Sequence, residues 1–390
     1  MDKNTITKLI IILLIFLSLE FVLANLVESR NDTINIYWWM LTGEIMGGEG
    51  FFNVWTAYPP VFPALFHGAY SLLRGYPERV ILLWKIFNLI LISSSAILIY
   101  LIINKIHNKT SALVSAIGFF LINMSWNSAI LVGIKSDQFD YFPIFLLLFS
   151  LYFLLKKKIL LSSLFCAIGT LTKLFPVIIL VLAFFNLKRK NRIKYVSIFL
   201  ITCFLIILPF LIINPNIFFS GFIWNLGRDS WETIWTYPDI KFAEIQSHEP
   251  MIFPVTLEKT GNSSLTFVMA TAFLLIVYFI RNKLHNKDNV IKTALILLLL
   301  ILIFSKGISS YFILWLFPLI IISYKDIYGF IIVSILLLVG NIEHTSNTYY
   351  WLSIFLRHAI FIGLFLHQIF LMSRNHEIRQ VNTDPNFISL

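Results

Sequence analysis

Long apolar runs alternate with short polar turns along nearly the whole chain. The runs are rich in Leu, Ile and Phe, which is typical of helices that cross a bilayer, because about 20 apolar residues span its hydrocarbon core. The pattern predicts an all-α, polytopic transmembrane helical bundle that forms a single integral membrane domain over residues 1–390. About twelve spans are expected, at 9–27, 80–103, 112–131, 141–155, 159–172, 174–187, 195–213, 264–281, 292–305, 309–324, 327–341 and 350–372.

Composition supports the same class. The 390 residues are 58% hydrophobic and 13% charged, whereas soluble domains carry about 25% charged residues. Both cysteines, Cys166 and Cys203, lie in apolar runs and indicate no redox compartment. The first run, 9–27, exceeds the usual apolar region of a signal peptide, about 7–15 residues. This length favours a retained signal-anchor over a cleaved signal peptide.

The net charge of +10 is concentrated in a few turns, which gives a topology. By the positive-inside rule these turns, both termini and the polar tail 375–390 are cytoplasmic. Two long loops, 28–79 and 214–263, then lie on the extracytoplasmic face, where we expect short helical segments. The basic clusters are at residues 105–109, 156–158, 188–194, 281–292 and 374–379.

One pair of spans is short. Residues 159–172 and 174–187 would each be about 21 Å long as helices, which is less than the hydrocarbon core of about 30 Å. Their turn contains Lys173, a cation that is costly at this depth unless it faces water or an anion. The N-terminus of the following helix would add N–H donors. We expect Lys173 to bind a phosphate; snorkelling to the interface is the alternative.

Further candidates lie in the first outer loop. Asp32 follows the first span by about five residues, and a carboxylate at the edge of a water-poor groove can act as a general base. Its alternative role is that of a solvated loop acid or a helix cap. Tyr58 opens a Tyr-Pro-Pro-Val-Phe-Pro step at 58–63, whose prolines restrict the backbone into a stiff lead to the next helix. The step is expected to be scaffold rather than reagent.

Three other polar or aromatic groups are candidates for substrate contacts. Gln138 and Asp140 lie in the turn before residue 141, where they could bind sugar hydroxyls or cap the next helix. Tyr311 opens a span that also contains Trp315, although aromatic belts at membrane interfaces explain this pattern too.

No Walker A, G-x-G-x-x-G, C-x-x-C or H-E-x-x-H pattern is present in the sequence. No cofactor or nucleic-acid partner is predicted, and a divalent metal is not indicated.

Taken together, these motifs resemble the GT-C superfamily of polytopic glycosyltransferases. The chain is most similar to the prokaryotic mannosyltransferase-like proteins related to the GPI-anchor mannosyltransferases. The resemblance covers most of the chain in order. It is carried by Asp32, the proline step 58–63, Gln138-x-Asp140, Lys173-x-x-Pro176, and Tyr311-x-x-x-Trp315-x-x-Pro318.

The resemblance implies a polyprenyl-phosphate monosaccharide donor, with mannose-like hexose favoured, and a lipid or glycan acceptor at the outer face of the cell membrane. Asp32 would be the general base of an inverting transfer, and Lys173 and Arg228 would hold the leaving phosphate. Tyr58, Gln138, Asp140 and Tyr311 would contact substrate. The family often has a second acid near the first, but Thr33 and Ile34 follow Asp32 here.

Two other classes stay open at this stage. A polysaccharide polymerase or ligase would share the spans and the large outer loop, but Arg228 is the only arginine within 214–263. A lipid-linked sugar transporter or flippase would need ionisable groups along a path through the membrane. Glu20, Lys85 and Arg357 are the intramembrane candidates, and they outline no path.

Overall fold

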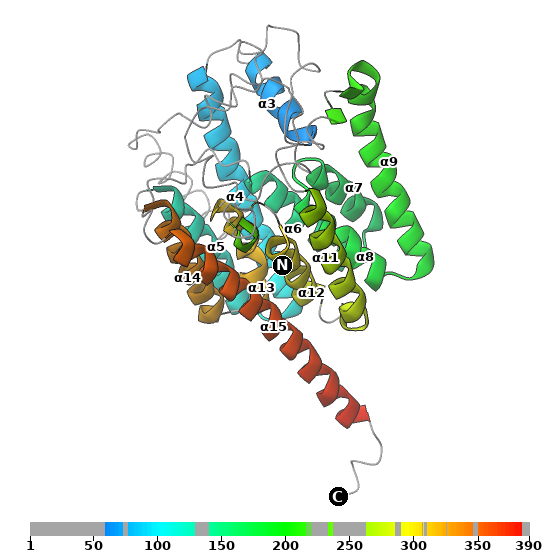
Figure 1. Cartoon of the computed structure of the whole chain (residues 1–390), viewed down its shortest axis with the longest axis vertical. Coiled ribbons are helices and arrows are strands. Elements are labelled where there is room, and N and C mark those ends of the chain that lie inside the picture. The colour runs from blue at the N-terminus through cyan, green and yellow to red at the C-terminus, as the bar shows by residue number, and fades with distance from the viewer. Residues whose placement is uncertain are drawn as a thin grey trace, which may run out of the picture. The chain divides into compact units, whose positions relative to one another are not determined.

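The computed structural model describes most of the chain after the first long loop (Figure 1). Its described residues form helices and turns without a β-strand, which confirms the expected all-α class. The described residues are 59–72, 77–128, 140–216, 218–219, 233–236, 263–284, 290–305, 307, 310–324, 326–345 and 350–383.

Eleven of the predicted spans fall wholly or mostly on described residues, and each overlaps a helix, although 174–187 and 309–324 each divide into a 3₁₀ helix and a shorter α-helix. The α-helices are α3 (Val61–Leu72), α4 (Pro77–Ile106), α5 (Lys109–Ser128), α6 (Tyr141–Leu155), α7 (Ile159–Thr170), α8 (Ile178–Asn186), α9 (Arg189–Ile213), α11 (Ser263–Leu284), α12 (Val290–Ile303), α13 (Phe317–Tyr324), α14 (Asp326–Thr345) and α15 (Tyr350–Thr383). Short 3₁₀ helices are η2 (Phe175–Val177), η3 (Ile234–Thr236) and η6 (Ser310–Trp315).

Many of the helices are short relative to the thickness of a membrane. Among the described residues, three segments are long and apolar enough to cross a membrane: Ile86–Ile106, Arg189–Ile213 and Trp351–Ser373. α6 and α7, with 15 and 12 residues, are shorter than the roughly 20 residues that a full crossing needs. Twelve crossings are therefore not confirmed, and the predicted span 9–27 lies outside the described residues.

Two helix ends differ from the prediction. α9 begins at Arg189 rather than at 195, because Arg and Lys are good helix formers and the basic run continues the helix. α15 extends to Thr383, beyond the predicted end at 372. The polar residues after Met372 contain no Gly or Pro before Pro385, so nothing in this stretch stops the helix.

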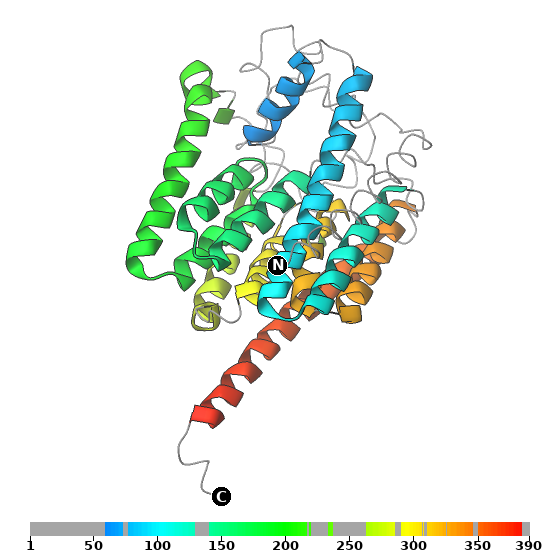
Figure 2. The same cartoon turned by 180° about the vertical axis from the view of Figure 1, so that it is seen from behind.

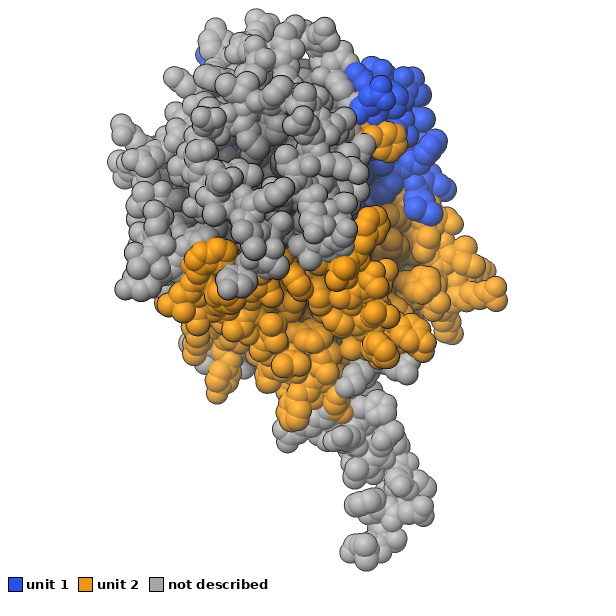
Figure 3. All heavy atoms as spheres, viewed as in Figure 1, with its two compact units in different colours: residues 1–176, 200–218 blue, residues 177–199, 219–390 orange. Residues whose placement is uncertain are grey.

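The chain divides into two compact units, coloured separately in Figure 3. Unit 1 comprises Met1–Pro176 and Leu200–Phe218. Within it α4 packs against α5 and α6, and α6 packs against α7. Figure 2 shows α4 and α5 side by side as antiparallel neighbours. Unit 1 therefore contains α7 and the turn with Lys173, whereas α8, the second helix of the predicted short hairpin, belongs to unit 2.

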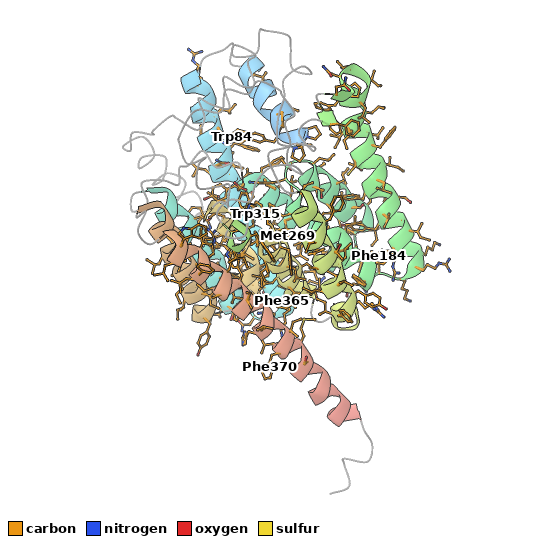
Figure 4. All side chains as sticks on the ribbon, viewed as in Figure 1. Trp84, Phe184, Met269, Trp315, Phe365 and Phe370 are labelled. Atoms are coloured by element: carbon orange, nitrogen blue, oxygen red, sulfur yellow. The ribbon has the colours of Figure 1, made fainter. Side chains whose placement is uncertain are left out.

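Unit 2 comprises Val177–Phe199 and Phe219–Leu390. Its central helix is α12, which packs against α8, α11, α13 and α15. α12 is apolar on all sides and almost wholly buried, as expected for a helix that other helices surround. On α15, Phe365 packs against the cluster of Ile296, Leu300 and Met372, whereas Phe370 is 61% exposed (Figure 4).

Large apolar side chains also remain exposed on other helices. The apolar part of α9 is only 6% buried, and residues such as Leu200 and Phe204 on this helix are more than half exposed. α11 exposes Phe267 and Phe279 in the same way. Exposed apolar faces of this extent indicate contact with a membrane or another protein. Together with the candidate spans, they identify a membrane protein.

Candidate functional site

The site is built on the hairpin that α6 and α7 form in unit 1, at the end that carries Lys173. α6 and α7 are joined by the lysine turn at residues 156–158, and α7 ends at Thr170. The backbone N–H groups of Thr172 and Lys173 both donate to the carbonyl oxygen of Gly169, at 3.1 and 3.0 Å. The Thr172 hydroxyl donates to Ile168 O at 2.9 Å. The end of α7 is thus closed by its own residues, and this closure fixes the backbone from which the Lys173 side chain starts.

Two buried serines tie α6 to α7. The Ser150 Oγ donates to Ser162 O at 2.7 Å, and the Ser162 Oγ donates to Ser150 O at 2.8 Å. Both residues are fully buried. Reciprocal bonds of this kind satisfy polar groups where water is absent and fix the register of the two helices. This pair was not among the predicted site residues, although serines at matching depths of two apolar runs are a usable signal.

Gly169 allows the end of α7 to lie close against its neighbours. A β-carbon at this position would stand 3.1 Å from the Cβ atoms of both Leu146 on α6 and Pro176. The Cys166 thiol also contacts Pro176, with its Sγ 3.5 Å from the carbonyl oxygen. The chain after Lys173 therefore folds back onto α7, and Pro176 of the Lys-x-x-Pro motif forms part of this packing.

The central feature of the site is an ion pair. Lys173 Nζ lies 2.5 Å from Asp140 Oδ1, and the two residues are 33 positions apart. The Asp140 side chain is 0% exposed and that of Lys173 is 11% exposed. Two buried opposite charges compensate each other, whereas either charge alone would be strongly unfavourable. The pair joins the start of α6 to the end of α7, and Lys173 is its more accessible member.

Asp140 does not act as the helix cap that was the alternative prediction. It occupies the N-cap position of α6, but its side chain makes no capping hydrogen bond there. Its backbone carbonyl accepts from Ile144 N at 3.1 Å, so the helix starts in the ordinary way. The carboxylate is directed instead to Lys173.

The proline step meets the same turn. The last part of the proline step, from Val61 to Pro63, is helical rather than the stiff lead that was predicted, because α3 already begins at Val61. Pro63 therefore lies in the first helical turn, where a missing N–H costs no hydrogen bond. The Val61 N–H donates to Leu171 O at 3.0 Å, two residues before Lys173. Phe62 packs edge to face on Trp84 of α4, with ring centroids 6.0 Å apart.

Three of the five sequence motifs are thus in contact through described residues: the proline step, Asp140 and the Lys-x-x-Pro turn. The scaffold role expected of the proline step agrees with its bond to the turn. Chemically, the arrangement presents an ammonium group at the end of a hairpin, with its position fixed by a carboxylate.

The other predicted site residues are not placed. Asp32, Tyr58, Gln138 and Arg228 lie outside the described residues. Tyr311 belongs to η6, where only its backbone is described. The roles predicted for these residues remain predictions.

Trp315, from the same motif as Tyr311, is buried rather than exposed as a membrane belt. Only 5% of its surface is accessible, and its ring stacks on Phe312 at 4.2 Å between centroids.

In the part of the chain that the structure describes, no group of three His, Cys, Asp or Glu side chains could hold a metal ion.

Solved structures with a similar arrangement include those of the Archaeoglobus fulgidus oligosaccharyltransferase. Its apo form gives a TM-score of 0.45 at 12% identity, covering 94% of this chain and 56% of that one. The form tethered to an acceptor peptide gives 0.39 at 12% identity, covering 86% and 50%. The present chain thus spans about half the length of that enzyme. A comparison with curated proteins gives no match.

The family comparison is more informative. The family model for glycosyltransferase family 87 matches residues 55–305, well over half of the chain. The matched range contains the proline step, Asp140 and Lys173. The expectation of a membrane glycosyltransferase is thereby confirmed, and the chain belongs to glycosyltransferase family 87.

Proposed function

We propose that this membrane glycosyltransferase transfers a monosaccharide, a mannose-like hexose, from a polyprenyl-phosphate donor to a lipid or glycan acceptor at the extracytoplasmic face. The observation that supports this most is the Lys173 ammonium at the end of α7, held by Asp140. The leaving group of such a reaction is an anion, and a fixed cation stabilises it. The predicted topology places the Lys173 turn on the extracytoplasmic face. The ends of α6 and α7 farther from Lys173 meet at the three lysines 156–158, which the positive-inside rule places in the cytoplasm.

At the phosphate, Lys173 supplies hydrogen-bond donors. An ammonium group has three N–H donors, and the Lys173 ammonium donates to Asp140 Oδ1. Lys173 is proposed to donate to phosphate oxygens of the donor as well, with Arg228 of the second long loop adding a second cation. Asp140, predicted as a sugar contact, enters this proposal as the residue that positions Lys173.

At the acceptor, Asp32 is proposed as the general base. The acceptor oxygen forms a bond to the anomeric carbon while the bond from that carbon to the phosphate oxygen breaks on the opposite face, so the configuration inverts. The acceptor proton passes to Asp32, and polyprenyl phosphate leaves with the bonding electron pair. Tyr58, Gln138 and Tyr311 are proposed to contact the sugar.

The proposal is tested by incubating the purified protein with acceptor lipids and a panel of polyprenyl-phosphate monosaccharides. Mass spectrometry then scores the transfer products. The wild-type protein should use at least one of these donors, with the hexose forms preferred. Transfer from nucleotide sugars alone, with none from any lipid-linked sugar, would rule the proposal out.

The role of the base is tested with Asp32→Asn. Loss of a general base lowers the rate by about 10²–10⁴-fold, and affinity for the donor should change little. Glu28→Gln is the matched control, because it removes a carboxylate from the same loop. Equal rates for Asp32→Asn and the wild type would remove Asp32 from the mechanism.

A further inference from the structure

The end of unit 1 that lies away from Lys173 carries a concentration of positive charge. It is formed by two turns, between α4 and α5 and between α6 and α7. Five lysines of these turns are all exposed. We refer to them as the lysine cluster: Lys105, Lys109, Lys156, Lys157 and Lys158.

The two turns form one surface because a hydrogen bond joins them. The Lys105 Nζ donates to the carbonyl oxygen of Leu155, in the last turn of α6. Carbonyl groups at a helix C-terminus lack partners within the helix, and a cation is the favourable group to satisfy them. α4 also packs against both α5 and α6. The lysine cluster is therefore held in place by the fold.

One lysine occupies a backbone position that normally favours glycine. Lys157 has φ 59°, in the left-handed region where a β-carbon is unfavourable. The Lys158 N–H donates to Phe153 O at 2.9 Å, and the Lys157 N–H to Leu154 O at 3.0 Å. This is the Schellman arrangement, in which glycine is the usual residue at the position of Lys157. The backbone conformation at position 157 favours glycine, so it does not explain why a lysine is present there.

The helices that carry the lysine cluster supply no acid to balance its charge after position 78 of α4, or in α5, α6 and α7. No Asp or Glu occurs in residues 79–128 or 141–176. Asp140 stands at the start of α6, the end of that helix away from the lysine cluster, and is paired there with Lys173. Apolar residues next to these lysines in the sequence are exposed as well. Ile106 is 41%, Leu160 57% and Leu161 36% exposed.

We infer that the lysine cluster binds the headgroup of an anionic phospholipid, whose acyl chains lie along Ile106, Leu160 and Leu161. The charge selects a negative headgroup, since each lysine near a membrane surface adds attraction to anionic lipid. The exposed apolar residues favour an amphiphile over a soluble anion. This binding is separate from the donor site at Lys173 and does not depend on its role.

The test uses the full-length protein in detergent with equal amounts of phosphatidylglycerol and phosphatidylcholine, and native mass spectrometry to measure bound lipid. The variant is Lys109→Gln/Lys157→Gly/Lys158→Gln, which keeps Lys105 as the link between α4 and α6. Glycine suits the backbone at 157, so the fold should be retained. The control is Lys188→Gln/Lys190→Gln/Lys194→Gln, three exposed lysines immediately before and within the first turns of α9.

The wild type should retain phosphatidylglycerol over phosphatidylcholine. Affinity for phosphatidylglycerol should fall about fivefold for each lysine removed and on the order of a hundredfold for the triple variant, with less than about a threefold change in the control. Equal losses in both triple variants would overturn the inference. So would the absence of a lipid preference in the wild type, or full displacement of the lipid by millimolar glycerophosphoglycerol, which has the headgroup without acyl chains.

Discussion

Breaking the Asp140–Lys173 pair provides a sharp test of the site as the structure shows it. Lys173→Met removes the cation and leaves the Asp140 carboxylate, 0% exposed, without its partner. Removing one member of a buried ion pair costs about 3–5 kcal/mol. Asp140→Asn should cost less, about 1–3 kcal/mol, because the Lys173 side chain is 11% exposed and its stem can carry the charge toward water.

The double variant Asp140→Asn/Lys173→Met separates stability from function. With neither charge present, no uncompensated charge is buried. The free energy of unfolding should therefore return to within about 2 kcal/mol of the wild-type value. Transfer activity should stay low, since the ammonium is still missing. The non-additivity of the two single changes then measures the coupling between the residues.

Detergent-based unfolding, followed by tryptophan fluorescence, gives the free energy of unfolding for all four proteins. Lys190→Met, at an exposed lysine near the start of α9, is the control for loss of one positive charge. If Lys173→Met were as stable as this control, the buried pair would contribute nothing and the reasoning about the hairpin would fail. Additive effects of the two single substitutions would refute the pairing in the same way.

Two further predictions concern the hairpin. Gly169→Ala places a β-carbon 3.1 Å from the Cβ of Leu146 and should destabilise the protein by about 1–3 kcal/mol. Gly363→Ala, a helical position with no atom within 4 Å, should instead stabilise by about 0.5–1 kcal/mol in the same unfolding assay, and equal effects at the two positions would contradict the packing. Ser150→Ala and Ser162→Ala should each cost about 0.5–1.5 kcal/mol, with the double variant less than additive; a fully additive double variant would contradict the reciprocal bonds.

Much of the helical layout could be predicted from the sequence because charges bracket the apolar runs. Both ends of α6 were placed at residues 141 and 155, where the structure has them. The lysines that follow α6 mark its end, and a polar turn precedes its start. Where charged residues continue a helix, as at Arg189 in α9, the same reasoning placed the boundary too late.

The site was only partly predictable. Lys173 stood out because a cation in a short apolar hairpin needs an explanation, and Asp140 stood out as a polar residue in a turn. Their contact could not be read from the chain, since 33 residues separate them and no periodicity links the two positions. The bond from Val61 to Leu171 is likewise a product of tertiary packing between segments distant in sequence.

Binding of the leaving group, polyprenyl phosphate, to the Asp140→Asn/Lys173→Met variant tests the central claim most directly. Polyprenyl phosphate is titrated into this variant, the wild type and Lys190→Met in nanodiscs, and the dissociation constants are compared. Loss of charge-assisted bonds of about 1.5–3 kcal/mol corresponds to affinity weakened by about 10- to 150-fold, with the Lys190→Met control unchanged. A dissociation constant equal to that of the wild type would show that Lys173 does not hold the phosphate.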